Sequence, residues 1–238
     1  MKIDFKGKTI LITGATNGIG KSIAKSFYGL RGNVIGTSTT KNFKKRNFLL
    51  YKVDFLKKNE FDNFCNFIKN KKIDILINNA GINKIEKINN LKINNYNDIL
   101  FVNLKVPAIL TKIISKNMIK KKEGKIINIS SIFGSVSKSQ RSSYSSSKFG
   151  LIGLTKSSSL DLAKYNIMVN SVSPGFIKTK LTKKILKEKG IKKISKIIPM
   201  NRLGNVKEIS NLVNFLSSKY NTYITGQNII IDGGFTSE

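Results

Sequence analysis

The chain alternates between short, almost wholly apolar runs and longer stretches with helical periodicity. The short runs are rich in β-branched residues, as expected of strands that are buried on both faces of a sheet. The pattern predicts strands at 9–13, 33–37, 48–53, 73–78, 125–130, 168–172 and 228–232. The clearest amphipathic helices are predicted at 18–30, 94–121, 143–164 and 206–217. This order implies βαβ crossovers, and so an α/β fold in which helices cover both faces of a doubly wound parallel sheet of about seven strands.

Two connections do not fit a regular crossover helix. The segment 38–47 is short and basic, and it leaves little room for a full helix. The segment 178–198 is rich in lysine and has apolar residues at helical spacing. It could form a pair of amphipathic helices that folds over a site as a lid, or an ordinary solvated surface helix. Because we find no repeat, linker or change of composition, we expect a single domain over residues 1–238.

The formal net charge of +30 at pH 7 is the most unusual bulk property. A charge of this size is typical of proteins that bind nucleic acids or anionic membranes. However, only four of the 43 basic residues are arginine, the side chain best suited to recognising phosphates and bases. Because lysine, asparagine and isoleucine are all abundant, we attribute the charge to compositional bias and expect no specific nucleic-acid partner. The alternatives are a polyanion-binding role and electrostatic steering of anionic ligands.

The scarcity of histidine and cysteine argues against several kinds of functional site. The chain has no histidine, which removes histidine-based catalytic triads and most zinc sites. The single cysteine, Cys65, cannot form an internal disulfide and lies in a helix-like stretch, where we expect it to be inert. Residues 1–8 lack the apolar core of a signal peptide, and no apolar run approaches the roughly 20 residues of a membrane span. We therefore expect a cytoplasmic protein without a metal cofactor or a membrane partner.

A glycine-rich loop follows the first predicted strand and opens the first predicted helix. It reads Thr-Gly-Ala-Thr-Asn-Gly-Ile-Gly over residues 13–20. Its glycines permit a tight turn, and the helix N-terminus offers free N–H groups to a pyrophosphate. A simple strand-to-helix turn is the alternative interpretation. The pattern T-G-x-x-x-G-x-G resembles that of the short-chain dehydrogenase/reductase family, which implies a Rossmann-type fold and cofactor contacts from Gly14, Asn17, Gly18, Ile19 and Gly20.

The candidate chemistry involves Tyr144 and Lys148, which are four residues apart and therefore on one face of a predicted helix. A free phenol has a pKa of about 10, and a neighbouring ammonium group lowers it by stabilising the phenolate. We therefore expect the pair to donate and accept a proton at a carbonyl/alcohol couple. Taken alone, this spacing would also fit an incidental pair. A serine hydroxyl could bind the same substrate oxygen, with Ser131 as the candidate and Ser130 as the alternative.

The family resemblance covers essentially the whole chain and assigns roles to these residues. It implies that Tyr144 is the acid/base, that Lys148 also binds the nicotinamide ribose, and that Ser131 polarises the substrate carbonyl. Asn103 resembles the asparagine that kinks a helix in this family and holds a water connecting Lys148 to solvent. A nicotinamide cofactor would supply the hydride, because no side chain stores one.

Further motifs resemble the cofactor site of the family. They are Asn-Asn-Ala-Gly at 78–81, Asn-Ser-Val-Ser-Pro-Gly at 170–175 and the closing strand around 223–234. The resemblance implies cofactor contacts, in addition to those from Tyr144 and Lys148, from Thr37, Ser38, Asp54, Phe55, Asn79, Ala80, Gly81, Pro174, Gly175, Ile177 and Thr179.

The end of the second predicted strand bears on the choice of cofactor. It has no carboxylate, although NAD-dependent enzymes of this kind usually place one there on the ribose. Thr37, Ser38 and Lys41 offer hydroxyls and a cation instead, which favours the 2′-phosphate of NADP. Asn17 argues against this choice, because many NADP-dependent members carry arginine or lysine at that position. We predict NADP as the cofactor and keep NAD as the alternative.

Within the family the sequence is most similar to β-ketoacyl-[acyl carrier protein] reductases, for example at 202–204. This resemblance implies a carrier-linked carbonyl substrate and a homotetramer, and a basic surface would attract an acidic carrier protein. The alternatives are a reductase of a sugar or another small hydroxy compound, and a cofactor-binding regulator without enzymatic activity. We expect the segments 82–93, 132–143 and 178–200 to determine specificity, but they do not identify the substrate.

Overall fold

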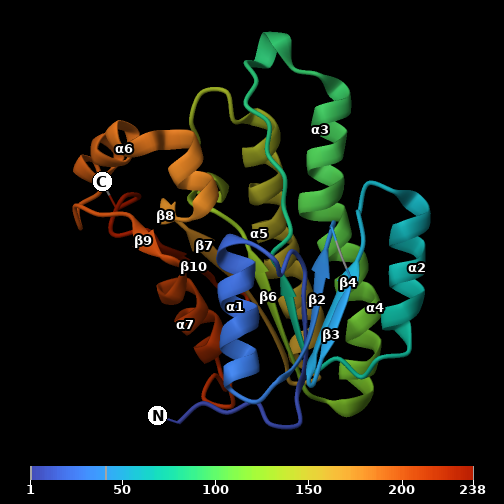
Figure 1. Cartoon of the computed structure of the whole chain (residues 1–238). Coiled ribbons are helices and arrows are strands. Elements are labelled where there is room, and N and C mark those ends of the chain that lie inside the picture. Colours follow the sequence, from blue (N-terminus) through green and yellow to red (C-terminus); the bar gives the residue numbers. More distant parts are fainter. Residues whose placement is uncertain (1, 41, 238) are drawn as a thin grey trace.

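The computed structural model describes residues 2–40 and 42–237, and it places one large sheet between two layers of helices (Figure 1). The strands of this sheet are β1 Thr9–Ile12, β2 Asn33–Ser38, β3 Phe43–Lys45, β4 Phe48–Lys52, β5 Ile75–Asn78, β6 Gly124–Ile129, β7 Ile167–Pro174 and β10 Asn228–Ile231. A separate two-stranded sheet consists of β8 Ile177–Lys178 and β9 Gly204–Asn205.

The strand order is β10-β7-β6-β5-β1-β2-β4-β3. Neighbouring strands are parallel, except that β3 is antiparallel to β4. From β1 the chain adds β2 and β4 on one side, and it then crosses to the other side to add β5, β6, β7 and β10. The winding therefore reverses between β1 and β5. In open α/β sheets, ligands bind outside the carboxyl ends of the strands at such a reversal.

Helices and short turns connect the strands. The α-helices are α1 Gly18–Gly29, α2 Lys58–Lys69, α3 Ile93–Leu100, α4 Val106–Lys121, α5 Ser142–Ala163, α6 Lys180–Lys196 and α7 Val206–Ser217. A π-helical turn, Phe101–Lys105, joins α3 to α4. Two 3₁₀ turns lie at Ile88–Asn90 and Ile132–Gly134.

The alternation of side chains along the strands produces two hydrophobic cores. Ile10 and Ile12 of β1 belong to the core beneath α1 and α7, whereas Leu11 belongs to the core beneath α2, α4 and α5. Each core contains a fully buried aromatic residue from a covering helix, Phe27 from α1 and Phe64 from α2. The nearly continuous apolar character of the strands follows from this burial on both faces.

All seven predicted strands are confirmed, with ends that differ by at most two residues. The segment 38–47, predicted to be too short for a crossover helix, contains the additional strand β3. This strand turns back along the outer edge of β4, and its three residues are all exposed. It therefore lacks the apolar pattern that reveals the buried strands.

Two predicted helices are less regular than expected. The helix predicted at 94–121 is divided by the π turn at Phe101–Lys105, and such turns occur frequently at functional sites. The segment 178–198, for which we expected either a pair of amphipathic helices or a surface helix, forms α6, which is broken at Lys187 with φ 51° and ψ −178°. Figure 1 shows α6 beyond the carboxyl ends of the strands. Its role as a lid stays a prediction. Over residues 2–40 and 42–237, no helix combines the length and the apolar character needed to cross a membrane.

Candidate active site

The glycine-rich loop at the carboxyl end of β1 is hydrogen-bonded to the strands on both sides. The hydroxyl of Thr13 accepts from the N–H groups of Asn79 and Ala80 after β5, at 2.9 Å each. On the other side, the N–H of Gly14 donates to the hydroxyl of Thr37 at the end of β2, at 3.0 Å. The side-chain amide of Asn79 also donates to the carbonyls of Thr13 and Gly14, at 2.9 and 3.1 Å. These bonds fix the loop where the winding of the sheet reverses.

Three features of the loop fit a pyrophosphate. Gly14 and Gly18 have φ of +66° and +49°, a region that other residues rarely adopt. A side chain at Gly20 would overlap the carbonyl oxygen of Gly14 and the amide of Asn79. The first turn of α1 contains no acidic residue, and the side chain of Asn17 does not cap it. Its N–H groups are therefore available to an anion at the positive end of the helix dipole.

The residues predicted to bind the 2′-phosphate make hydrogen bonds within the protein. Thr37 and Ser38 are both buried. The hydroxyl of Ser38 lies 3.0 Å from that of Thr40 and accepts from the N–H of Thr40 at 3.1 Å. Lys41, the predicted cation, lies outside the described residues. The contacts of this group with a 2′-phosphate therefore stay a prediction.

The residues predicted on the adenine side follow β4 and open α1. The carboxylate of Asp54 accepts from the N–H of Leu56 at 3.1 Å, which shapes the turn after the strand. Phe55 is buried, and its ring lies edge-on to that of Phe61, with centroids 5.5 Å apart. Ile19, in the first turn of α1, packs against the first core. The contacts of these three residues with a cofactor also stay predictions.

Asn103 is fully buried in the π turn and connects two other segments. Its Oδ1 accepts from the N–H of Ile82 at 2.8 Å, and its Nδ2 donates to the carbonyl of Ile82 at 2.9 Å. The same Nδ2 lies 3.0 Å from the hydroxyl of Ser147 on α5. Ser147 precedes Lys148 and donates to the carbonyl of Tyr144 at 2.7 Å. This amide therefore fixes the loop after β5 relative to α5.

Lys148 lies beneath Tyr144 on α5, with its Nζ 5.6 Å from the centroid of the tyrosine ring. The amine is buried and donates to the carbonyl of Ile129 at 2.8 Å. This burial lowers the pKa of Lys148 to about 8. Gly81 lies close by, because a Cβ there would be 3.8 Å from the amine and 3.3 Å from Oδ1 of Asn103. The predicted tyrosine, lysine and asparagine are thus brought together at the end of β5 and β6.

The electrostatics of Tyr144 differ from the sequence-based expectation. Burial raises the pKa of the phenol, and this effect outweighs the lowering by the hydrogen bond with Ser131 and by the charge of Arg141. The prediction that Lys148 lowers this pKa below its usual value is therefore wrong in this structure. The physical reason is that the phenol is desolvated, while the lysine amine is buried and bonded to a backbone carbonyl. A phenol in this state is protonated at neutral pH.

The structure distinguishes the two candidate serines. Ser131 follows β6, accepts from the N–H of Phe133 at 3.2 Å and lies close enough to Tyr144 to lower the pKa of its phenol. The hydroxyl of Ser130 donates instead to the carbonyl of Lys148 at 3.1 Å. Ser130 therefore attaches α5 to β6, whereas Ser131 lies at the phenol. This geometry favours Ser131 as the residue that binds the substrate oxygen.

The end of β7 and the segment after it contribute the remaining predicted positions, Pro174, Gly175, Ile177 and Thr179. Gly175 packs closely, because a Cβ there would lie 2.6 Å from the Cβ of Asp232. A Cβ on Gly18 would lie 3.5 Å from the methyl group of Thr179, which caps α6 by accepting from the N–H of Thr182. The start of α6 therefore lies next to the glycine-rich loop.

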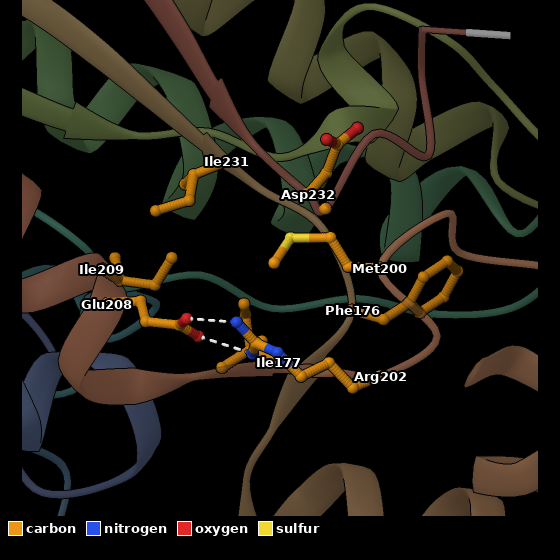
Figure 2. Close-up of a pocket in the computed structure, with 10 residues that line it drawn as sticks. Phe176, Ile177, Met200, Arg202, Glu208, Ile209, Ile231 and Asp232 are labelled. Atoms are coloured by element: carbon orange, nitrogen blue, oxygen red, sulfur yellow. Dashed lines mark hydrogen bonds and ion pairs between the residues drawn. The ribbon is translucent and has the colours of Figure 1, made fainter.

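A small cavity of about 60 Å³ lies behind this segment, near the start of α7 (Figure 2). The guanidinium of Arg202 donates to the carboxylate of Glu208 at 2.6 and 3.1 Å in its wall, and Phe176 and Met200 also line it. This ion pair, with the N–H of Asn205, lowers the pKa of Glu208 to about 2. Small-molecule sites usually exceed roughly 300 Å³. We therefore assign the cavity to the anchoring of α7 and not to the substrate.

Two sets of supporting residues were missed by sequence reasoning. One is Ser147, which holds the amide of Asn103. The other is a buried chain across β5, β6 and α5, in which Asn78 donates to Asn128 at 2.8 Å and Asn128 donates to Thr155 at 2.9 Å. Such residues are abundant in this chain, so composition gives no signal. Their places inside the 78–81 and 144–148 motifs were the signals that could have identified Asn78 and Ser147.

Comparisons with known proteins agree over nearly the full length. A family model described as enoyl-(acyl carrier protein) reductase matches residues 14–236, a range that includes every predicted site residue. A 3-oxoacyl-[acyl-carrier-protein] reductase of Buchnera aphidicola subsp. Baizongia pistaciae is 40% identical over 95% of this chain and 96% of its own. The solved structure of ElxO with NADP bound is 32% identical, with a TM-score of 0.89 over 97% of this chain and 99% of that one. A 4-hydroxyisoleucine dehydrogenase complexed with NADH is 31% identical, with a TM-score of 0.91 over 98% and 100%.

Ser147→Ala is expected to destabilise the protein, because it removes a hydrogen-bond partner from the buried amide of Asn103. An unsatisfied buried donor costs about 1–3 kcal/mol, and we expect the free energy of unfolding to fall by that amount in urea denaturation. Ser146→Ala is the matched control, since Ser146 is exposed on the same helix turn and should change stability by less than about 0.5 kcal/mol. Equal stability of the two variants would contradict the role of Ser147.

Lys148 should make the stability of the protein depend on pH. Its folded pKa of about 8 lies below the unfolded value of about 10.4, so the unfolded chain binds more protons between these limits. The free energy of unfolding should therefore rise with pH from about 8 towards 10. We expect this rise in the difference between the parent and Lys148→Met, measured by denaturant unfolding at a series of pH values. If the difference in unfolding free energy between the two proteins does not change over this pH interval, the pKa of Lys148 is not lowered in the folded state.

Proposed function

The chain belongs to the short-chain dehydrogenase/reductase family, and we propose that it is an NADP(H)-dependent oxidoreductase that interconverts a carbonyl group and a secondary alcohol, acting as a 3-oxoacyl-[acyl carrier protein] reductase. The observation that carries the proposal is the placement of the Ser131 hydroxyl and the protonated phenol of Tyr144 beside each other, above the buried amine of Lys148. Two neighbouring hydroxyls can bind a single substrate oxygen, which is what reduction of a carbonyl requires.

Tyr144 transfers the proton at the substrate oxygen. Its raised pKa keeps the phenol protonated, so it donates the proton when a carbonyl is reduced. In the reverse direction the phenolate must accept that proton, and Ser131 and Arg141 are the neighbours that stabilise it. Ser131 also donates to the substrate oxygen and stabilises the charge that develops there. The nicotinamide, when bound, supplies or accepts the hydride.

Lys148 and Asn103 restore the proton that Tyr144 releases. An amine with a pKa of about 8 both holds and releases a proton near neutral pH. The amine and Oδ1 of Asn103 flank Gly81, which has no side chain to fill the space between them. We assign this space to a water that connects the amine to solvent through Asn103 and the carbonyl of Ile82. The same amine would bond the ribose hydroxyls of the nicotinamide half.

The assignment of NADP is supported by the end of β2. It carries the hydroxyls of Ser38 and Thr40 and no carboxylate that would repel a 2′-phosphate. The similar structure of ElxO contains NADP, whereas the 4-hydroxyisoleucine dehydrogenase contains NADH. The pyrophosphate would lie on the N–H groups at the start of α1.

The substrate assignment is supported by the 3-oxoacyl-[acyl-carrier-protein] reductases that resemble this chain over nearly their full length. The description of the family model favours a second candidate, reduction of a carbon–carbon double bond in an enoyl thioester. The neighbouring hydroxyls of Ser131 and Tyr144 favour reduction of the 3-oxo carbonyl group. They are suited to an oxygen that gains a proton and negative charge.

Tyr144→Phe is expected to lower kcat for the reduction of acetoacetyl thioesters by about 10²–10⁴, the usual contribution of a general acid. The ring itself is kept, and with it the edge-on contact with Phe133 at 6.5 Å. Tyr165→Phe is the matched control, because Tyr165 follows the far end of the same helix. Activity would be measured as NADPH oxidation. Undiminished activity in Tyr144→Phe would contradict the proposed mechanism.

NADPH is expected to bind at least about tenfold more tightly than NADH, a difference of about 1.4 kcal/mol. The physical reason is the absence of a carboxylate at the end of β2. Fluorescence titration of the full chain with each cofactor measures the two dissociation constants. Equal affinities together with equal rates of substrate reduction would contradict the assignment of NADP.

We further propose a homotetramer, which is supported by apolar side chains that this chain leaves at its surface. Leu160 and Phe149 on α5 are 81% and 48% exposed, and Tyr223 and Ile230, near and on the edge strand β10, are 97% and 37% exposed. Such exposure is typical of surfaces that pack against other subunits. Light scattering at micromolar concentration should give the mass of four chains, and Leu160→Lys should lower it. A monomeric parent protein would refute the proposal.

A further inference from the structure

Two loops meet beyond the carboxyl ends of the strands and form an open cleft of about 420 Å³. One contains the 3₁₀ turn Ile88–Asn90, and the other is 137–142, which leads into α5. The N–H of Glu86 donates to the carbonyl of Gln140 at 3.3 Å and joins them. Figure 1 shows the start of α5 and the turn before α3 projecting beyond the sheet. The cleft therefore lies at the same end of the molecule as the active site.

Every charged side chain that lines the cleft is a cation, namely Lys87, Lys138 and Arg141. The neighbouring Glu86 does not line it. One of its carboxylate oxygens accepts from the side-chain amide of Asn95 at 2.7 Å, and the other is buried without a hydrogen-bond partner among the described residues. These three cations converge from two loops on one concave site, where the positive potential is focused.

Neutral hydrogen-bond donors accompany the cations. Helix α5 begins at Ser142 with no acidic residue in its first turn, and the side chain of Arg141 does not cap it. The first N–H groups of the helix therefore favour an anion. The hydroxyl-bearing residues Ser137, Ser139 and Ser142 also line the cleft, and the oxygen of Ser142 is buried without a hydrogen-bond partner in the described part of the chain. The cleft thus has donors of three kinds for an anionic group.

The cleft is connected to the reacting position by direct contacts. The guanidinium carbon of Arg141 lies 5.7 Å from the ring centroid of Phe133. The ring of Phe133 lies edge-on to Tyr144, with centroids 6.5 Å apart. A substrate with its carbonyl at Tyr144 can therefore extend the rest of its chain past Phe133 into the cleft.

We propose that this cleft binds the phosphate group of a phosphorylated thioester arm while the substrate carbonyl lies at Tyr144. The inference rests on the proposed function, because it concerns the same site. Lysine and arginine side chains, hydroxyls and helix N–H groups are the donors that phosphate esters accept. An uncharged ester would leave Lys87, Lys138 and Arg141 without a counter-charge. The arm can belong to a carrier protein or to coenzyme A, since both carry a phosphate ester.

The test compares three substrates with the same acetoacetyl group: acetoacetyl-pantetheine, its 4′-phosphate, and acetoacetyl-coenzyme A. The parent protein should show a kcat/KM ratio of phosphorylated to unphosphorylated substrate of at least about ten. In the double variant Lys87→Gln/Lys138→Gln this ratio should fall about five- to tenfold, mainly through KM. The matched control, Lys69→Gln/Lys72→Gln, removes the same charge from exposed positions at the opposite end of the sheet and should keep the parent ratio.

A parent ratio near one would overturn the inference, and so would an equal fall of the ratio in both double variants. A preference for coenzyme A without a preference for the 4′-phosphate would also overturn it, because the adenosine phosphates would then be responsible.

Titration calorimetry with pantetheine 4′-phosphate and pantetheine separates this inference from the proposed function. Tighter binding of the phosphate form to the parent, lost in Lys87→Gln/Lys138→Gln, supports the cleft even if no thioester is reduced. In that case only the proposed function is contradicted. Equal affinity for pantetheine 4′-phosphate and pantetheine contradicts phosphate binding in the cleft, whether or not the thioesters are reduced.

Discussion

The buried amine of Lys148 is the feature around which the active site is arranged. It lies between α5 and the end of β6, where it donates to the carbonyl of Ile129 at 2.8 Å. A solvated lysine has a pKa of about 10.4 and would hold its proton firmly at neutral pH. Burial opposes the charged form and brings the pKa of Lys148 to about 8. The amine, one helical turn from Tyr144, can therefore gain and lose a proton near neutral pH.

The neighbouring side chains are placed to keep this amine in position. Ser130 attaches the carbonyl of Lys148 to β6, and Ser147 connects the same turn of α5 to Asn103. Asn103 reaches both partners because the π turn at Phe101–Lys105 changes the direction of its side chain relative to a regular α-helix. Gly81 leaves room beside the amine that any larger residue would occupy. The reversal of the sheet between β1 and β5 then places the glycine-rich loop next to this group.

The sequence was informative wherever a residue type is imposed by local geometry. The buried strands could be predicted because both faces must be apolar, and the glycine-rich loop because Gly14 and Gly18 adopt positive φ. The exposed strand β3 could not be predicted, since nothing in 43–45 must be apolar. The π turn was also invisible, because its residues resemble those of an ordinary helix. The pKa of Tyr144 was predicted in the wrong direction, because spacing shows which groups are near each other but not how deeply they are buried.

We propose that this site directs hydride from the nicotinamide to a carbonyl carbon and a proton to the carbonyl oxygen. The most direct test is to reduce a 3-oxoacyl thioester with NADPH that carries deuterium at the transferring C4 position, and to locate the label in the product by NMR. The account predicts a 3-hydroxyacyl product with one deuterium on the carbon that bears the hydroxyl group. A product without deuterium at that carbon, or reduction of a 2-enoyl thioester in place of the 3-oxoacyl substrate, would contradict it.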